Sequence, residues 1–218
     1  MAKGTTFGTV HSNVNLHLIQ QSVKISPALP KTNFIDIVGM DGAIDATNAL
    51  GETNYSNREI EWKYALYPGE DWFAKQSEVS NALNGILCNI VLDEEKGWYY
   101  RGRVSVEDYD SDRLLRTITV KAVCFPWKMK VAETTVSRAD LSTSYKQLQL
   151  PNERRPVVPT ITVAQDTTLL WQGNTYTINA GTHRLPDIQL QAGDNILKAK
   201  VPDLDTGSIT VEYQEASL

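Results

Sequence analysis

Apolar and polar residues alternate along much of this chain with a period of two, which is typical of β-strands that have one buried and one solvated face. The alternation is clearest in residues 58–67, REIEWKYALY, where charged residues separate Ile60, Trp62, Tyr64 and Leu66. The same pattern predicts strands over residues 16–25, 34–38, 86–92 and 117–124. The first half of the chain is therefore expected to form a sheet.

One helix interrupts these strands. The acids of Pro68–Asp71 suit the positive N-terminal end of a helix, and Asn84–Gly85 offers a C-terminal stop. Between these signals, apolar residues recur near helical spacing at Trp72, Val79, Leu83 and Ile86. The pattern predicts a helix that lies on the sheet through the face that carries Trp72.

The character of the sequence changes after Lys128. Residues 131–150 are rich in Thr and Ser, and Pro151–Pro156 followed by Pro159 predicts an exposed, stiff connection. From Thr160 onward, short apolar runs alternate with turn signals at a spacing of about 8 to 12 residues, which is typical of a sandwich or jelly-roll. Strands are expected at residues 160–163, 169–171, 176–178, 188–190, 196–201 and 209–213.

These patterns predict a mainly β protein with two domains. Residues 1–130 are expected to form a β-sandwich-like domain with one α-helix and an extended hairpin. Residues 131–218 are expected to form a small β-sandwich. A chain of 218 residues is long enough for two such domains, each with its own hydrophobic core.

Charge and composition narrow the function. The net charge of −5 and a pI near 5.3 argue against nucleic-acid binding, because neutralising phosphates requires clustered Lys and Arg. No run approaches the length of about 18 apolar residues that crosses a bilayer, and residues 1–10 lack the apolar segment of a secretory signal. The protein is therefore expected in a cytoplasm, unless it leaves by lysis or inside an assembly.

The two cysteines, Cys88 and Cys124, each lie in an apolar alternating run. Such a setting is typical of small buried residues in a reducing compartment. A disulfide between them is the less favoured alternative.

An acidic cluster invites a test for calcium binding. Asp108–Asp112 has the D-x-D-x-D start of an EF-hand loop, but the sixth position should be glycine and is Arg113, and the twelfth should be an acid and is Thr119. The cluster is therefore interpreted as an acidic turn that joins two strands. Asp93–Gly97 is likewise interpreted as a polar turn before a strand.

Catalytic and metal-binding patterns are missing from the sequence. His11, His17 and His183 fit no zinc spacing, and no Cys-x-x-Cys exists to complete a site. No nucleophile elbow, Walker loop or dinucleotide fingerprint occurs, and Gly39–Gly42 predicts a turn that is too short to cradle a phosphate. The chain is therefore expected to have no catalytic residues, no cofactor and no metal.

Aromatic side chains make a better case for binding than for catalysis. Trp171 and Tyr176 lie in the predicted second sandwich. If their rings are exposed there, they could stack on the faces of sugar rings. The simpler interpretation is that both rings fill the core of the sandwich, because half of the positions on a sandwich strand face inward.

Several motifs occur in a fixed order in the first half of the chain. The most specific is YYRGRV at Tyr99–Val104, and Val38–Asp45 forms a glycine-containing turn region. The others are Phe7–Gly8, Val23–Ile25 before Pro27 and Pro30, Asn57–Glu61, the Trp72 helix and Cys124–Lys128. Together these motifs resemble the distal tail protein family of long-tailed bacteriophages and related prophages.

The resemblance spans about residues 7–128. Val38 and Met40 depart from it, because family members commonly carry proline and arginine there in a PGRDG-like turn. After residue 131 the resemblance depends only on length, on strand texture and on the final strand ITVEYQ.

The resemblance implies a structural hub at the virion tail tip, or baseplate. In the family, N-terminal domains associate into a hexameric ring at the end of the tail tube, and galectin-like C-terminal domains project outward as a platform. The implied partners are further copies of the chain, the tail-tube and tape-measure proteins, a tail-associated lysin or tail-tip protein, and receptor-binding or side proteins. Residues 131–218 leave no room for the carbohydrate-binding insertion that some relatives carry.

Two other functions stay open from the residues alone. A carbohydrate-binding module of a phage or bacterial cell-surface complex would bind glycans through Trp171 or Tyr176. A hydrolase is the least favoured alternative, because the sequence carries no nucleophile motif.

Overall fold

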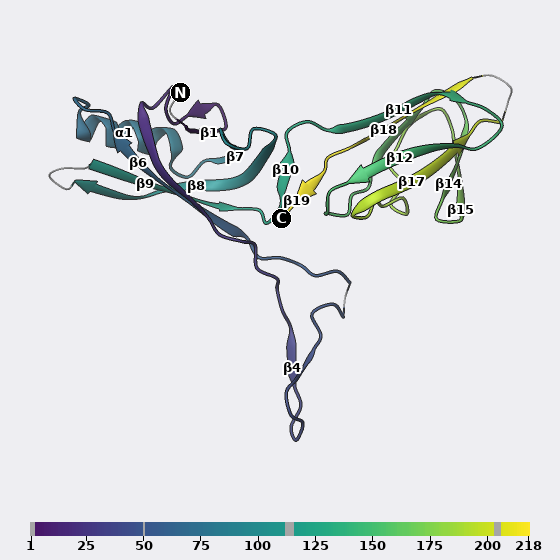
Figure 1. Ribbon diagram of the computed structural model, residues 1–218, viewed down its shortest axis with the longest axis horizontal. Coiled ribbons are helices and arrows are strands. Elements are labelled where there is room, and N and C mark those ends of the chain that lie inside the picture. Colours follow the sequence, from purple (N-terminus) through teal and green to yellow (C-terminus); the bar gives the residue numbers. More distant parts are fainter. Residues whose placement is uncertain (1–2, 50, 112–115, 203–205) are drawn as a thin grey trace. The chain divides into compact units, whose positions relative to one another are not determined.

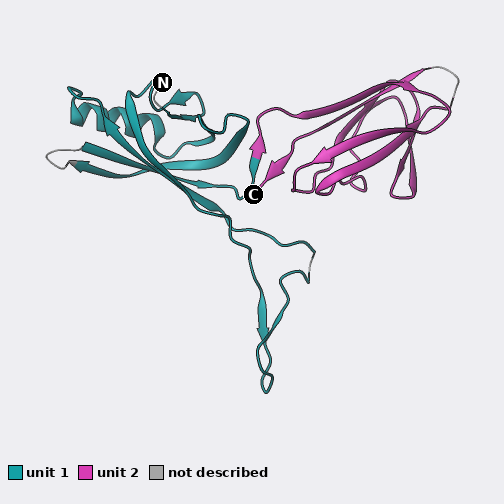
Figure 2. Ribbon diagram, viewed as in Figure 1, with its two compact units in different colours: residues 1–128, 218 teal, residues 129–217 magenta. Residues whose placement is uncertain are grey.

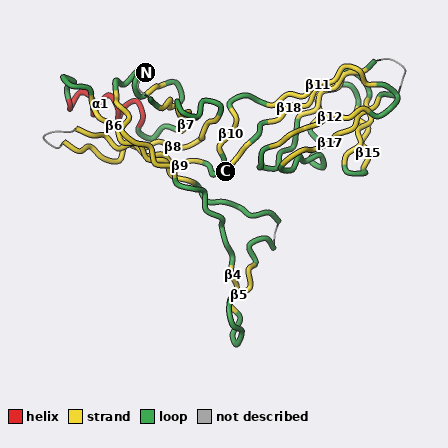
Figure 3. Tube along the Cα trace, viewed as in Figure 1, coloured by secondary structure: helices red, strands yellow, loops and turns green. Residues whose placement is uncertain are grey.

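The computed structural model describes residues 3–49, 51–111, 116–202 and 206–218. It divides into two compact units, residues 1–128 with Leu218, and residues 129–217 (Figure 2). Each unit has its own cluster of buried apolar side chains. The fold is mainly β with one helix, as the sequence predicts (Figure 3).

The first unit is built on an antiparallel sheet. Its strands follow the order β2 (Val10–His11), β1 (Thr5–Phe7), β7 (Leu87–Leu92), β8 (Trp98–Ser111), β9 (Arg116–Cys124), β6 (Arg58–Leu66) and β3 (Leu18–Ile25). Strand β6 alternates as predicted, with Ile60, Trp62 and Tyr64 fully buried. Because side chains alternate between the two faces of a strand, Arg58 lies on the same buried face as these residues.

The single helix, α1 (Trp72–Leu83), covers the buried face of this sheet (Figure 1). It begins where the sequence predicts, because the Asp71 carboxylate accepts a 2.8 Å hydrogen bond from the backbone N–H of Ala74. It ends at Asn84, and Gly85 follows with φ of +81°, a conformation that glycine adopts without strain. Trp72, Val79 and Leu83 point into the core, as the predicted face requires.

A long excursion separates β3 from β6. The chain leaves the sheet after Ile25 and returns at Arg58, and residues 26–57 between these points are called the arm. Its distal part is a two-stranded hairpin of β4 (Phe34–Asp36) and β5 (Ala43–Asp45), which extends from the sheet (Figure 1). Residue 50 of the arm lies outside the described residues.

The second unit is a sandwich of two four-stranded antiparallel sheets. One sheet has the order β11 (Thr134–Leu141), β18 (Gly207–Tyr213), β13 (Thr160–Val163) and β16 (Gly181–His183). The other has the order β12 (Lys146–Asn152), β17 (Gly193–Lys200), β14 (Thr167–Trp171) and β15 (Asn174–Ile178). The short strands β10 (Lys128–Lys130) and β19 (Ala216–Ser217) pair where this unit begins and ends.

Three predictions about secondary structure are wrong. The first acids of the cluster, Asp108 and Asp110, lie within β8 and pair with β9, so they are not the turn; Asp112 lies outside the described residues. The predicted connection at Pro151–Pro156 begins too early, because Pro151 and Asn152 still belong to β12. Residues 188–190 form no strand: Ile188 and Leu190 are buried, but only Leu190 forms an isolated bridge, to Val157.

Candidate assembly interface

The arm exposes an unusual number of apolar side chains. Val38 is fully exposed and Phe34 is 57% exposed, although residues of these types normally lie in a core. All of residues 31–45 are exposed. The exposed apolar residues of the arm are Leu29, Phe34, Ile35, Ile37, Val38, Met40 and Ile44.

The base of the arm is anchored to the first unit. The backbone N–H of Ser26 donates to the carbonyl of Glu59 at 2.9 Å, and Pro30 and Tyr55 form an antiparallel bridge. The Tyr55 ring also packs edge-on against Trp127, with ring centroids 5.5 Å apart. Beyond this base, β4 and β5 pair over only three residues each, and the glycines Gly39 and Gly42 turn the tip with positive φ.

An isolated two-stranded hairpin is marginally stable in water, and soluble proteins rarely leave a contiguous apolar patch exposed. The arm combines both properties, since its side chains have no core of their own to enter. These observations make the arm a candidate surface for association with another polypeptide.

A second surface for association is the sheet edge. Strand β3 pairs with β6 on one side, and on its other side the described part of the chain provides no partner strand. The backbone N–H and C=O of Leu18, where the strand begins, are bonded to Ser12 and Asn13. The rest of this edge, residues 19–25, is a template for pairing with another chain.

The first residue of β6 is a buried arginine, Arg58, which the sequence analysis missed. Arg58 is 5% exposed, and its Nε has no hydrogen-bond partner. Its guanidinium lies over the Tyr100 ring, 5.5 Å from the centroid. The alternation of β6 contained the signal, because Arg58 occupies an inward position of REIEWKYALY.

The candidate metal residues form no site in the described residues. No group of three or more His, Cys, Asp or Glu side chains is arranged to hold a metal ion there. The acidic cluster places Asp108 and Asp110 on a strand, where they lie in a paired ladder and not around a loop.

The histidines hold turns and loops. His11 Nδ1 accepts hydrogen bonds from the backbone N–H groups of Asn13 and Val14, at 3.2 and 3.1 Å. Nε2 therefore carries the proton and donates to Asp93 at 3.1 Å. Both ring nitrogens are occupied, so neither is available as a general base. His17 lies 3.6 Å from Glu70, and His183 contacts the Asn179 carbonyl.

The candidate glycan residues lie in and beside the core of the second unit. Trp171 is 3% exposed, so its indole faces are in contact with protein, and Tyr176 is half-buried and packs against the same core. The structure does not bring the two rings together on an open surface. Glycan contact through these residues stays a prediction that their burial disfavours.

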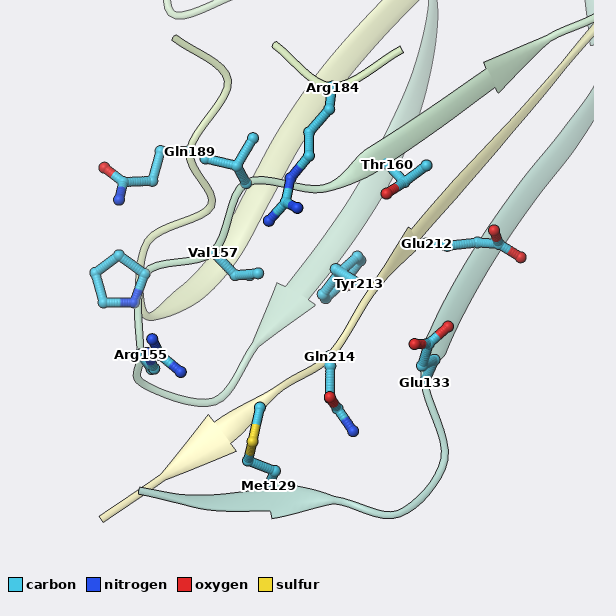
Figure 4. A pocket seen from close by; sticks show the side chains of 12 residues that line it. Met129, Glu133, Arg155, Val157, Thr160, Arg184, Gln189, Glu212, Tyr213 and Gln214 are labelled. Carbon is cyan, nitrogen blue, oxygen red and sulfur yellow. The ribbon is translucent and has the colours of Figure 1, made fainter. Parts of the chain in front are cut away.

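A polar pocket of about 520 Å³ lies elsewhere on the second unit (Figure 4). The Tyr213 ring lies among its polar side chains, and its hydroxyl donates to the Pro151 carbonyl at 2.5 Å. Burial raises the pKa of Tyr213 to about 12, so this hydroxyl stays protonated at neutral pH. The other polar side chains that line the pocket are Glu133, Arg155, Thr160, Arg184, Gln189, Glu212 and Gln214.

Both cysteines are free thiols. Cys88 and Cys124 both pair with Gly102, which lies on the strand between them. Two strand spacings separate their Cα atoms by roughly 10 Å, whereas a disulfide needs less than about 7 Å. The sheet therefore keeps the two sulfurs apart.

No helix among the described residues is both long enough and apolar enough to span a bilayer.

Comparisons with known proteins identify the fold. No protein-family model matches the chain, and no curated protein matches its sequence. Among solved structures, the chain is similar to the crystal structure of the SPP1 Dit (gp 19.1) protein, described as a paradigm of the hub adsorption apparatus in phages that infect Gram-positive bacteria. The TM-score is 0.69 and the sequence identity 17%, and the match covers 100% of both chains. The chain therefore has the fold of the phage SPP1 Dit protein.

Proposed function

We propose that this chain is a structural distal tail protein of a long-tailed phage or prophage, and that six copies form the ring of its baseplate hub. The observation that carries the proposal is the similarity to SPP1 Dit over the full length of both chains, joined to the order of motifs in residues 7–128. Exposed apolar residues on the arm support self-association, because a ring of copies would cover them.

In the proposed hub, the first unit forms the ring below the tail-tube protein, and the tape-measure protein and DNA pass through it. The second unit, in the role of a galectin-like platform, carries receptor-binding or side proteins, and a lysin or tail-tip protein lies below. The net negative charge suits a passage for DNA, because like charges limit adhesion. The protein acts by assembly, without catalysis, at the tail tip of the virion.

Purified full-length chain tests this proposal. Light scattering, native mass spectrometry and negative-stain microscopy should show hexameric rings, either with the chain alone or after mixing with the tail-tube protein of the same phage or prophage. A strict monomer that never enters tails in an infected cell contradicts the proposal.

The pocket of Figure 4 favours a second candidate function, glycan binding by the second unit. Arginine, glutamine and glutamate side chains are the groups that hydrogen-bond sugar hydroxyls, and the pocket gathers them at one place. Saturable binding of cell-wall polysaccharide that Arg184→Ala abolishes and Trp171→Phe leaves intact would support it. Normal tail assembly without any polysaccharide binding would contradict this second function and leave the hub as the one supported function.

A further inference from the structure

We propose that Arg58, at the base of the arm, is a receptor for the carboxylate of Asp41 at the arm tip of a second copy of the chain. The proposal rests on the ring proposed above and names one contact that holds neighbouring copies together.

The first observation is a buried cation without an acid. Arg58 is 5% exposed and forms no ion pair with any described residue. The groups that face it are the Tyr100 ring and the Cys124 thiol, which burial keeps neutral by raising the pKa of each to about 12. Glu95, which contacts the Tyr100 hydroxyl, is paired with Lys128.

Such an arrangement is costly in the isolated chain. A charge that leaves water loses several kcal/mol of solvation unless a counter-charge or hydrogen bonds replace the water. The Arg58 Nε has neither, since it is buried and has no hydrogen-bond partner. A carboxylate from another chain could accept two parallel hydrogen bonds from the N–H groups of the Arg58 guanidinium, which is the bidentate arrangement.

The second observation is a pocket at the same place. A cavity of about 360 Å³ is lined by Ile25, Ser26, Pro27, Ala28, Arg58 and Leu218. The wall is mostly apolar, Ser26 adds a hydroxyl, and Arg58 supplies its one charged side chain. The cavity therefore suits a ligand that carries one carboxylate among apolar groups. It is called the Arg58 pocket.

The third observation is that the arm tip has this chemistry. Asp41 is exposed, and the structure gives its carboxylate no hydrogen bond or ion pair. Its neighbours Val38, Met40 and Ile44 are exposed apolar residues. The glycines on either side of the tip, Gly39 and Gly42, leave the turn slim enough to enter a pocket.

The reach of the arm is sufficient. Ser26 and Asp41 are 15 positions apart in the sequence, and extended chain spans at most about 50 Å over that number of residues. A unit of the size of residues 1–128 has a radius of gyration of about 14 Å and is roughly 36 Å across. The tip of one arm can therefore extend past one unit to the base of the next arm.

Two single variants test the contact, with the wild-type chain as reference. Asp41→Asn removes the charge at an exposed tip, where it leaves the fold unchanged, and Arg58→Met removes the cation and keeps the volume. Each should raise the protein concentration at half-assembly by about 30-fold or more, as measured by mass photometry. Glu52→Gln, which removes another acid of the arm, and Arg101→Met, which removes an exposed arginine, should leave that concentration within about 3-fold of wild type.

A mixture of the two variants separates a lost contact from a damaged fold. The Asp41→Asn chain keeps an intact Arg58 pocket and the Arg58→Met chain keeps an intact tip. Native mass spectrometry should therefore detect mixed pairs at a concentration where neither variant associates alone, and the pairs should not grow into closed rings. The double variant should be no weaker in assembly than either single variant.

The outcomes distinguish this contact from the ring itself. A wild-type chain that forms no ring contradicts the proposed function. A wild-type ring that Asp41→Asn leaves unchanged overturns the contact alone, whether or not Arg58→Met folds. If the Arg58→Met chain assembles like wild type, the Arg58 guanidinium is not needed between copies, and this also overturns the contact.

Discussion

At the scale of single residues, the motif YYRGRV has a packing explanation. Gly102 of this motif lies on β8 between Cys88 on β7 and Cys124 on β9. A Cβ atom at this position would lie 2.5 Å from Cys124 Sγ and 2.8 Å from the Val123 carbonyl oxygen. The glycine is required because the neighbouring strand approaches too closely for any side chain.

Gly102→Ala should therefore destabilise the first unit. Overpacking of this kind costs about 1–3 kcal/mol of unfolding free energy, and the backbone oxygen of Val123 cannot move aside without breaking the sheet. Urea denaturation of the purified chain measures the loss. Gly97→Ala is the matched control, since nothing lies within 4 Å of its added Cβ, and it should change the midpoint little. Equal midpoints for the two variants would refute the packing explanation.

Cys124 gives a pH prediction. Burial raises the pKa of its thiol from 9.0 to about 12. The folded state thus holds the proton more tightly than the unfolded state, and the stability this provides is present below pH 9 and is lost as pH rises from 9 to 12. At pH 11 the loss amounts to about 3 kcal/mol.

Cys124→Ala isolates that contribution. Between pH 8 and 11, the wild-type free energy of unfolding should fall by about 3 kcal/mol more than that of the variant. Parallel pH profiles for the two proteins would mean that the thiol titrates normally in the fold. The buried thiol should also resist alkylation at pH 8 until the protein unfolds.

At the scale of elements, the sequence predicts those whose signals are local. The helix α1 was predictable because Asp71, the Trp72 face and Asn84–Gly85 all act within a few positions of the helix, although Ile86, predicted to continue its apolar face, lies beyond its end. Strand β6 was equally clear from its alternation. Strands β11 and β12 were not predicted, because Thr and Ser dilute their apolar period, and only their pairing with β18 and β17 stabilises them.

The arm shows what a local sequence pattern does not predict. A strand was expected over residues 34–38 and β4 covers Phe34–Asp36, but nothing in the local pattern says that Phe34 and Val38 stay exposed. An apolar run predicts burial, and whether the covering atoms come from the same chain or another is a property of the assembly. The alternation of β6 likewise places Arg58 on the inward face, but the local pattern does not say which group satisfies a buried cation there.

A shortened arm tests its role as an element. The backbone N–H of Lys31 donates to the Asn54 carbonyl at 2.8 Å, and the neighbouring Pro30 and Tyr55 form an antiparallel bridge, so the two segments already lie side by side. Replacing residues 32–53 with Asn-Gly, which favours a two-residue hairpin, should close the gap without strain. The variant should keep the thermal midpoint of the first unit within a few degrees and lose ring assembly.

Both readouts are needed for the shortened arm. Ring formation at the wild-type concentration would show that the arm is dispensable for assembly. A large drop in the midpoint would instead place the arm in the fold of its own unit.

At the scale of the whole molecule, the two cores are the main feature. Trp62 belongs to the core of the first unit and Trp171 to that of the second, and no residue belongs to both clusters. The division suits the proposed hub, because each unit could then bind its own partners without reorganising the other. Each core is expected to unfold as its own cooperative unit.

Calorimetry of the full chain should therefore show two transitions, with enthalpies of about 90 kcal/mol for the first unit and about 60 kcal/mol for the second. Trp171 is the one tryptophan of the second unit, and it is 3% exposed in that core. Trp171→Phe leaves a cavity that costs about 1–3 kcal/mol and should lower the midpoint of the smaller transition by roughly 5–15 °C. The larger transition should not move, and Trp62→Phe should give the converse result. A single transition that both substitutions shift together would show that the two cores unfold as one.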